Sequence, residues 1–194
     1  MALTLSKKQT ISLEKTAGSA LSSISLGLGW DPVKAGFFGK LMGSSDEIDL
    51  DASCILLNSD LQKIDLVWFK QLKSTDGSIK HSGDNRTGDG DGDDETIHVD
   101  LQRLPAQVKH LVFTVNSFTG QNFEKVENAY CRIVNASNKA ELARFNLSEK
   151  GSHTGIVMAS LSRGNGDWEF KAIGTTTKGR TADDLVNLAV QALR

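Results

Sequence analysis

The residues with the clearest capacity for chemistry lie between positions 82 and 95, where carboxylates alternate with glycines. Six of the twelve residues from Asp84 to Glu95 are acidic, and Arg86 is the one cation among them. Like charges about 4 Å apart repel by roughly 1 kcal/mol in water and about 4 kcal/mol near a protein surface. The segment therefore either remains extended in solvent or is neutralised by a cation. The glycines favour the cation, because glycine allows strained backbone that turns successive carboxylates toward one point.

The type of cation follows from the available ligands, which are all oxygens. No cysteines cluster here, and His81 is the one nearby histidine, so a hard cation is expected, and calcium fits better than zinc or magnesium. The EF-hand pattern is met only in part. Counting from Asp89, position 6 is Asp94 where glycine is required, and position 12 is Asp100 where glutamate is required. The sequence thus predicts a calcium site of another architecture, with a solvated acidic turn as the alternative.

A second acidic element precedes the loop. Asp49 and Asp51 are two residues apart in a strand-like stretch, so their side chains share one face. Ile48, Leu50 and Ala52 alternate with them and are expected to face the core. Paired carboxylates on a strand face repel each other, and we expect this pair to complete the coordination that the loop begins.

The elements that position these groups are mostly short strands. Alternating or continuous apolar runs, bounded by Gly, Asn, Asp or Ser, predict strands over 9–14, 23–28, 49–57, 64–72, 97–101, 111–118, 129–134, 142–147, 155–161 and 168–173. The sequence Gly164-Asn-Gly166 between the last two predicts a hairpin. One helix is expected over Thr181–Leu193, with Thr181 as its N-cap. The prediction is an all-β fold: a two-sheet β-sandwich of about ten strands with a C-terminal helix.

Composition excludes several classes of protein. A net charge of −2 argues against a nucleic-acid-binding protein, and no apolar run approaches the roughly 18 residues of a transmembrane segment. No secretory signal is evident, and a cytoplasmic location is expected. Cys54 and Cys131 have no CxxC spacing, so two buried, reduced thiols are expected rather than a disulfide or metal pair. Residues 27–45, rich in glycine, are expected to form a loop insertion, a lid or a partner contact, in a single domain spanning 1–194.

Four motifs in order resemble those of the TerD-domain family of bacterial tellurium-resistance and stress proteins. They are Gly27-Leu-Gly-Trp-Asp31, Ile48-Asp-Leu-Asp-Ala-Ser53, the acidic stretch Ser82–Glu95, and Val126-Glu-Asn-Ala-Tyr-Cys-Arg-Ile-Val134. The resemblance covers nearly the whole chain. The 27–45 loop and Gly179-Arg-Thr181 look closest to the TerZ branch of the family.

This resemblance implies a β-sandwich that binds calcium through the acidic motifs, typically as two neighbouring ions. Carried over by motif, the metal ligands here would be Asp49, Asp51, Asp84, Asn85, Thr87, Asp89, Asp91, Asp93, Asp94 and Glu95. The resemblance further implies a non-enzymatic role in resistance to tellurite and other stresses. The implied partners are other tellurium-resistance proteins, in complexes at the inner surface of the inner membrane.

Two other functions remain open on the residues alone. One is a calcium-dependent module that binds carbohydrate or lipid headgroups, in which the ion bridges protein and ligand. The other is an enzyme that uses the cation to polarise a phosphoryl or carbonyl oxygen. Such an enzyme needs a general base beside the metal, and His81 is the nearest candidate.

Overall fold

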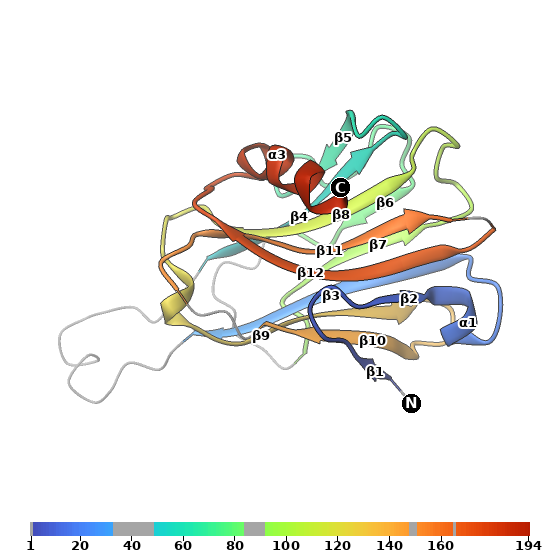
Figure 1. The fold of residues 1–194 in the computed structure, drawn as a ribbon, viewed down its shortest axis with the longest axis horizontal. Coiled ribbons are helices and arrows are strands. Elements are labelled where there is room, and N and C mark those ends of the chain that lie inside the picture. The colour runs from blue at the N-terminus through green and yellow to red at the C-terminus, as the bar shows by residue number, and fades with distance from the viewer. Residues whose placement is uncertain (1, 33–48, 84–91, 148–150, 165) are drawn as a thin grey trace.

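The computed structural model describes residues 2–32, 49–83, 92–147, 151–164 and 166–194. Two six-stranded sheets pack face to face (Figure 1). Sheet A has the order β1 (Leu3–Thr4), β10 (Glu141–Asn146), β9 (Val126–Asn135), β3 (Ser23–Pro32), β7 (Glu95–Asp100), β6 (Ile79–His81). Sheet B has the order β2 (Thr10–Ser12), β12 (Trp168–Thr177), β11 (Gly155–Arg163), β8 (His110–Ser117), β4 (Leu50–Leu57), β5 (Lys63–Val67). The predicted β-sandwich is confirmed.

Three helical segments complete the described chain: α1 (Leu13–Ala17), the 3-10 turn η1 (Phe123–Lys125) and α3 (Ala182–Leu193). The predicted C-terminal helix is confirmed, and it begins as expected after Thr181. The Thr181 side chain accepts a hydrogen bond from the Asp184 backbone N–H, and the Asp184 side chain accepts one from the Thr181 N–H. None of the described helices is long and apolar enough to cross a membrane.

Strand β4 shows how the layers are built, because both of its faces are buried. Leu50, Ala52, Cys54 and Leu56 point into the main core between the sheets. Ile55 and Leu57 point to the outer face of sheet B, where α3 covers them. A strand covered on both sides reads as a continuous apolar run, which is what residues 54–57 show.

The structure differs from the sequence-based expectation at several boundaries. The expected strand over 9–14 is a three-residue strand followed at once by α1, and the expected strand over 64–72 ends at Val67. Strands β1 and β6 were not predicted, because two or three residues carry too little periodicity. Both cysteines are buried and form no disulfide, as expected, and burial raises the pKa of Cys131 to about 12.

The glycine-rich loop expected over 27–45 is contradicted in its first six residues. Residues 27–32 belong to β3 and pair with β9, whereas residues 33–48 lie outside the described part of the chain. Gly27 and Gly29 serve close packing within the sheet. A Cβ on Gly27 would lie 2.0 Å from an Asp93 carboxylate oxygen, and a Cβ on Gly29 would lie 2.5 Å from the Tyr130 ring.

Candidate metal centre

The expected ligands divide into two sets. Asp84, Asn85, Thr87, Asp89 and Asp91 lie outside the described residues, whereas Asp49, Asp51, Asp93, Asp94 and Glu95 lie within them. The five described residues lie at the start of β4, which follows the undescribed residues 33–48, and at the start of β7, which follows the undescribed residues 84–91. The start of β4 and the end of β3 lie on the side opposite α1 and the β11–β12 turn (Figure 1).

Asp94 is held against β3 by two hydrogen bonds. Its backbone N–H donates to the Leu28 carbonyl (2.7 Å), and its carboxylate accepts from the Trp30 backbone N–H (2.8 Å). Burial raises the pKa of the Asp94 carboxyl, and the negative charges of Asp31, Glu95 and Asp93 raise it further, against the lowering effect of the Trp30 hydrogen bond. Burial and the neighbouring negative charges therefore disfavour the ionised form of this carboxyl.

Asp93 makes an ion pair across sheet A. Its two oxygens accept from Arg132 Nε (2.8 Å) and Nη2 (3.0 Å), and the Tyr130 hydroxyl donates to the first oxygen (3.1 Å). The guanidinium of Arg132 also bonds Glu141, which in turn bonds Arg144, so four charged side chains share one network. The Arg132 side chain is only 28% exposed. A cation at Asp93 would have to share the carboxylate with this arginine.

Glu95 links the two sheets rather than facing the loop. Its side chain is fully buried, and Oε2 accepts a hydrogen bond from the Ala52 backbone N–H on β4 (2.6 Å). His81 lies beside it, with Nε2 3.4 Å from the same oxygen and 3.1 Å from the Ala52 carbonyl. Since the Gly83 N–H donates to Nδ1 (3.0 Å), the ring proton is on Nε2 and points to the Ala52 carbonyl. Glu95 therefore fixes β7 to β4, one residue from Asp51.

Asp51 is 3% exposed and lies on the outer face of β4. Asn116, its cross-strand neighbour on β8, donates from Nδ2 to the Asp51 carboxylate (3.4 Å) and to the Arg180 carbonyl just before α3 (2.8 Å). The side-chain carbonyl Oδ1 of Asn116 is buried and has no hydrogen-bond partner among the described residues. Asp49 donates its backbone N–H to the Gln121 side chain (3.4 Å).

This donor set fits a calcium ion in its chemistry. Carboxylate and amide oxygens are the ligands that calcium prefers, and the buried Asn116 Oδ1 lacks any other partner in the described structure. Within the described ranges, no three His, Cys, Asp or Glu side chains converge on one point, so those residues alone do not complete a site. Sequence reasoning did not single out Asn116, because its position opposite Asp51 follows from the register of β4 and β8.

Comparison with known proteins places the chain among close relatives. A family model described as "TerD domain" matches residues 1–189. The tellurium resistance protein TerZ of Serratia marcescens is 56% identical over 98% of each chain. The stress response protein SCP2 of Bacillus subtilis (strain 168) is 39% identical over 96% of this chain and 98% of its own. A solved homologue of the telluride resistance protein TerD, SCO6318 from Streptomyces coelicolor A3(2), shares the fold with a TM-score of 0.68 at 21% identity, covering 86% of this chain and 96% of that one.

Proposed function

Because the chain belongs to the TerD-domain family of tellurium-resistance and stress-response proteins, we propose that it is a calcium-binding protein that acts without catalysing a reaction. In this proposal it works in the cytoplasm as an interaction module. Its partners are other tellurium-resistance proteins, in a complex at the inner surface of the inner membrane.

The observation that supports calcium most directly is a buried oxygen beside Asp51. The Asn116 Oδ1 atom has no hydrogen-bond partner among the described residues, and Asn116 lies opposite Asp51 across β4 and β8. Burial raises the pKa of the Asp94 carboxyl, and neighbouring carboxylates raise it further. A dication bound near these groups would favour the ionised carboxylates. Arg132 supplies positive charge nearby, and it forms ion pairs with Asp93 and Glu141.

Calcium binding would stabilise the folded chain by mass action. An ion that binds only the native state adds about 2.7 kcal/mol at a hundredfold excess over its Kd. The ten expected ligands include groups from the start of β4, Asp49 and Asp51, and from the start of β7, Asp94 and Glu95. Glu95 joins these two strand ends through its hydrogen bond to Ala52. An ion that binds at one end would therefore also stabilise the other.

A non-enzymatic role is supported by two observations. The relatives named above carry no enzymatic activity in their names. His81, the one histidine near the acidic loop, has a fully buried side chain, and its two ring nitrogens contact the Gly83 N–H and the Ala52 carbonyl. A general base must reach its substrate, and His81 does not reach solvent.

The test is a calorimetric calcium titration of the metal-stripped protein and two isosteric variants, Asp51→Asn and Asp94→Asn. Each variant should bind calcium at least tenfold more weakly, about 1.4 kcal/mol, because it loses one charged ligand. Asp60→Asn, at an exposed turn, is the matched control and should bind as the wild type does. Equal affinity in all four proteins would contradict the ligand assignment, and absence of binding in the wild type would contradict the calcium proposal.

The interaction role has its own test. A tagged copy of this chain, expressed with the other tellurium-resistance proteins of its host, should retain them on an affinity column in calcium and release them in chelator. Asp60→Asn should behave as the wild type, and Asp94→Asn should retain less. Retention that is the same with and without calcium would separate partner binding from the metal and contradict the coupling proposed here.

A further inference from the structure

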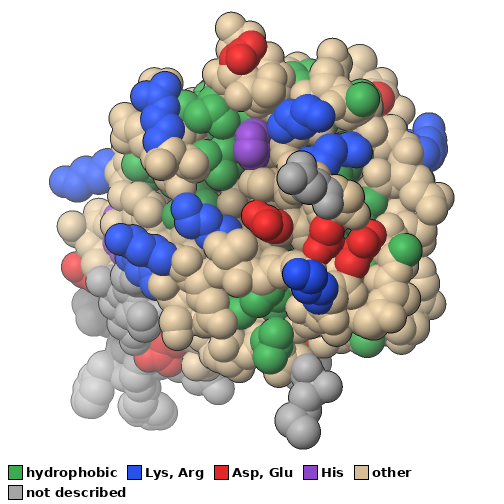
Figure 2. All heavy atoms as spheres, turned by 45° about the vertical axis from the view of Figure 1, so that its right-hand side comes forward, with side chains coloured by type: hydrophobic (Ala, Val, Ile, Leu, Met, Phe, Trp, Pro, Cys, Tyr) green, Lys and Arg blue, Asp and Glu red, His purple; other side chains and the backbone are tan. Residues whose placement is uncertain are grey.

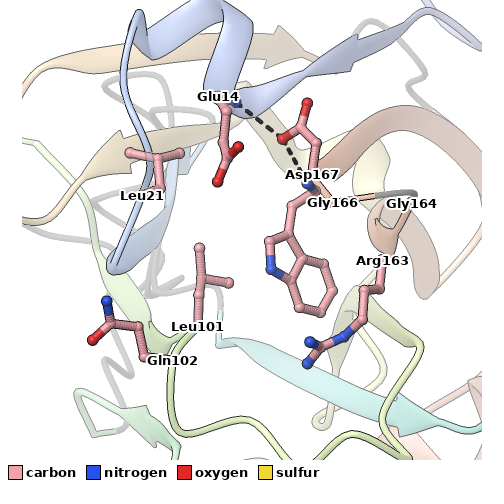
Figure 3. Close-up of a pocket in the computed structure, with 9 residues that line it drawn as sticks. Glu14, Leu21, Leu101, Gln102, Arg163, Gly164, Gly166 and Asp167 are labelled. Atoms are coloured by element: carbon pink, nitrogen blue, oxygen red, sulfur yellow. Dashed lines mark hydrogen bonds between the residues drawn. The ribbon is translucent and has the colours of Figure 1, made fainter.

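A cavity of about 280 Å³ opens at the end of the sandwich that carries α1 and the β11–β12 turn (Figure 3). Its apolar part is formed by Leu21, Leu101 and Trp168, which are 5–7% exposed. Two charged side chains, Glu14 from α1 and Arg163 from β11, also line it. Figure 2 shows the face that this end presents, where acidic and basic side chains lie close to one another.

Arg163 is held in place, but most of its N–H donors have no hydrogen-bond partner among the described residues. Its guanidinium lies over the Trp168 ring, 4.6 Å from the ring centroid, and Nη2 makes one long hydrogen bond to the Leu104 carbonyl (3.4 Å). The Nε atom is buried and has no hydrogen-bond partner among the described residues. Because a guanidinium has five N–H donors and matches a carboxylate in a planar fork, this arginine is suited to an anionic group.

Glu14 presents the opposite charge. Its carboxylate points toward the cavity and forms no ion pair with any described residue. Arg163 lines the same cavity, and the Glu14 carboxylate makes no hydrogen bond to it (Figure 3). The cavity therefore presents one acidic and one basic side chain.

Hydrogen bonds hold together the elements that carry these two side chains. The Asp167 carboxylate accepts hydrogen bonds from the backbone N–H groups of Glu14 (3.2 Å) and Trp168 (2.6 Å), and from the Ser12 hydroxyl. These bonds fix the start of α1 to the hairpin. Arg163 and Trp168 are paired directly across the β11–β12 ladder, which fixes the stack. Two opposite charges on hydrogen-bonded elements, with apolar side chains in the same cavity lining, form a pre-organised site for a ligand of matching polarity.

We propose that this cavity binds a small zwitterion that carries a protonated amine at one end and a carboxylate at the other. The carboxylate would bond the guanidinium of Arg163, and the ammonium would bond Glu14. The methylene groups between them would lie along the apolar part of the cavity lining. This site is distant in the fold from the acidic motifs and does not depend on calcium. The ligand class is an ω-amino acid or a small metabolite with the same pair of ends.

The wild-type protein can be tested with a series of ligands that acts as a molecular ruler. Glycine, β-alanine, γ-aminobutyrate and ε-aminohexanoate are titrated by calorimetry, with butylamine and butyrate as probes that carry one charge each. The expected result is saturable binding with a Kd of about 1 mM or tighter, best at one chain length and at least tenfold weaker for both single-charge probes. Absence of binding across the series, or equal binding of a single-charge probe, would overturn the proposal.

Matched variants then assign the two ends. Arg163→Gln and Glu14→Gln should each weaken the best zwitterion by roughly tenfold or more, because hydrogen bonds to charged groups are the strong ones. Arg103→Gln and Glu169→Gln make the same charge changes at exposed positions outside the cavity lining and should bind as the wild type does. An unchanged Kd in the first pair, or equal weakening in all four, would contradict the site. If a variant of the first pair does not fold, the ruler series on the wild type still decides.

Discussion

Replacing Glu95 with alanine removes a fully buried carboxylate that accepts the Ala52 N–H across the two sheets at 2.6 Å. The Ala52 N–H would lose this acceptor inside the core, at a cost of about 1–3 kcal/mol, and the missing side chain would leave a small cavity. Together these effects should lower the free energy of unfolding by about 2–4 kcal/mol. For a chain of this length the melting temperature should fall by roughly 5–15 °C.

The measurement is urea unfolding followed by tryptophan fluorescence, in excess chelator so that no metal contributes. The denaturation midpoint should fall while the slope of the transition stays constant. Glu95→Gln keeps one acceptor oxygen for the Ala52 N–H. Its free energy of unfolding should therefore fall by no more than about half as much as that of Glu95→Ala. Glu169→Ala, on the exposed face of β12, is the matched control and should stay within about 0.5 kcal/mol of the wild type.

The same experiment separates two roles for Glu95. If this residue were a metal ligand only, Glu95→Ala would be as stable as the wild type in chelator and would differ from it only in calcium. That result would refute the inference that Glu95 fixes β7 to β4. If Glu95→Ala is less stable than the wild type in chelator but gains as much stability as the wild type when calcium is added, Glu95 does not bind the ion directly.

Further changes test other parts of the fold. Gly27→Ala would place a Cβ 2.0 Å from an Asp93 oxygen and displace that carboxylate from Arg132. The free energy of unfolding, measured by calorimetry, should fall by about 1–2 kcal/mol. An unchanged melting temperature would contradict the packing described. Leu185→Ala removes a fully buried side chain where α3 packs on sheet B, and it should cost about 2–5 kcal/mol in urea, whereas a cost under about 1 kcal/mol would mean that α3 contributes little. Burial, and then the charges of two neighbouring lysines, lower the pKa of His98, so the unfolded chain binds a proton more readily and stability should rise as pH increases toward about 6.5. His98→Gln should flatten that rise, and an NMR titration of His98 showing a raised pKa would contradict it.

The sandwich itself could be predicted from alternation. Each long predicted strand has a counterpart, and the helix after Thr181 begins where its capping residues indicate. Short elements were not predicted. Helix α1 has five residues and β6 has three, which is too few for a hydrophobic period to be recognised. The extension of β3 to Pro32 was also not predicted, because the glycines at 27 and 29 suggested a loop. In the structure these glycines make room for Asp93 and Tyr130.

The candidate site was harder to predict, because its contacts depend on register. Asp93 meets Arg132 only after β3 aligns with β9 and the end of the acidic stretch folds over Gly27. The position of Glu95 was readable in principle. Glu95, Ile97 and Val99 alternate along one strand face, and the burial of the last two indicates that Glu95 points inward as well.

The direct test of the central claim is a calcium titration of the metal-stripped chain by calorimetry, with the melting temperature followed in parallel. The account predicts saturable binding, with two ions per chain expected from the family resemblance, and a melting temperature that rises with calcium in the wild type and in Asp60→Asn but less in Asp51→Asn and Asp94→Asn. A chain that shows no heat of binding and melts at the same temperature in calcium and in chelator would contradict it.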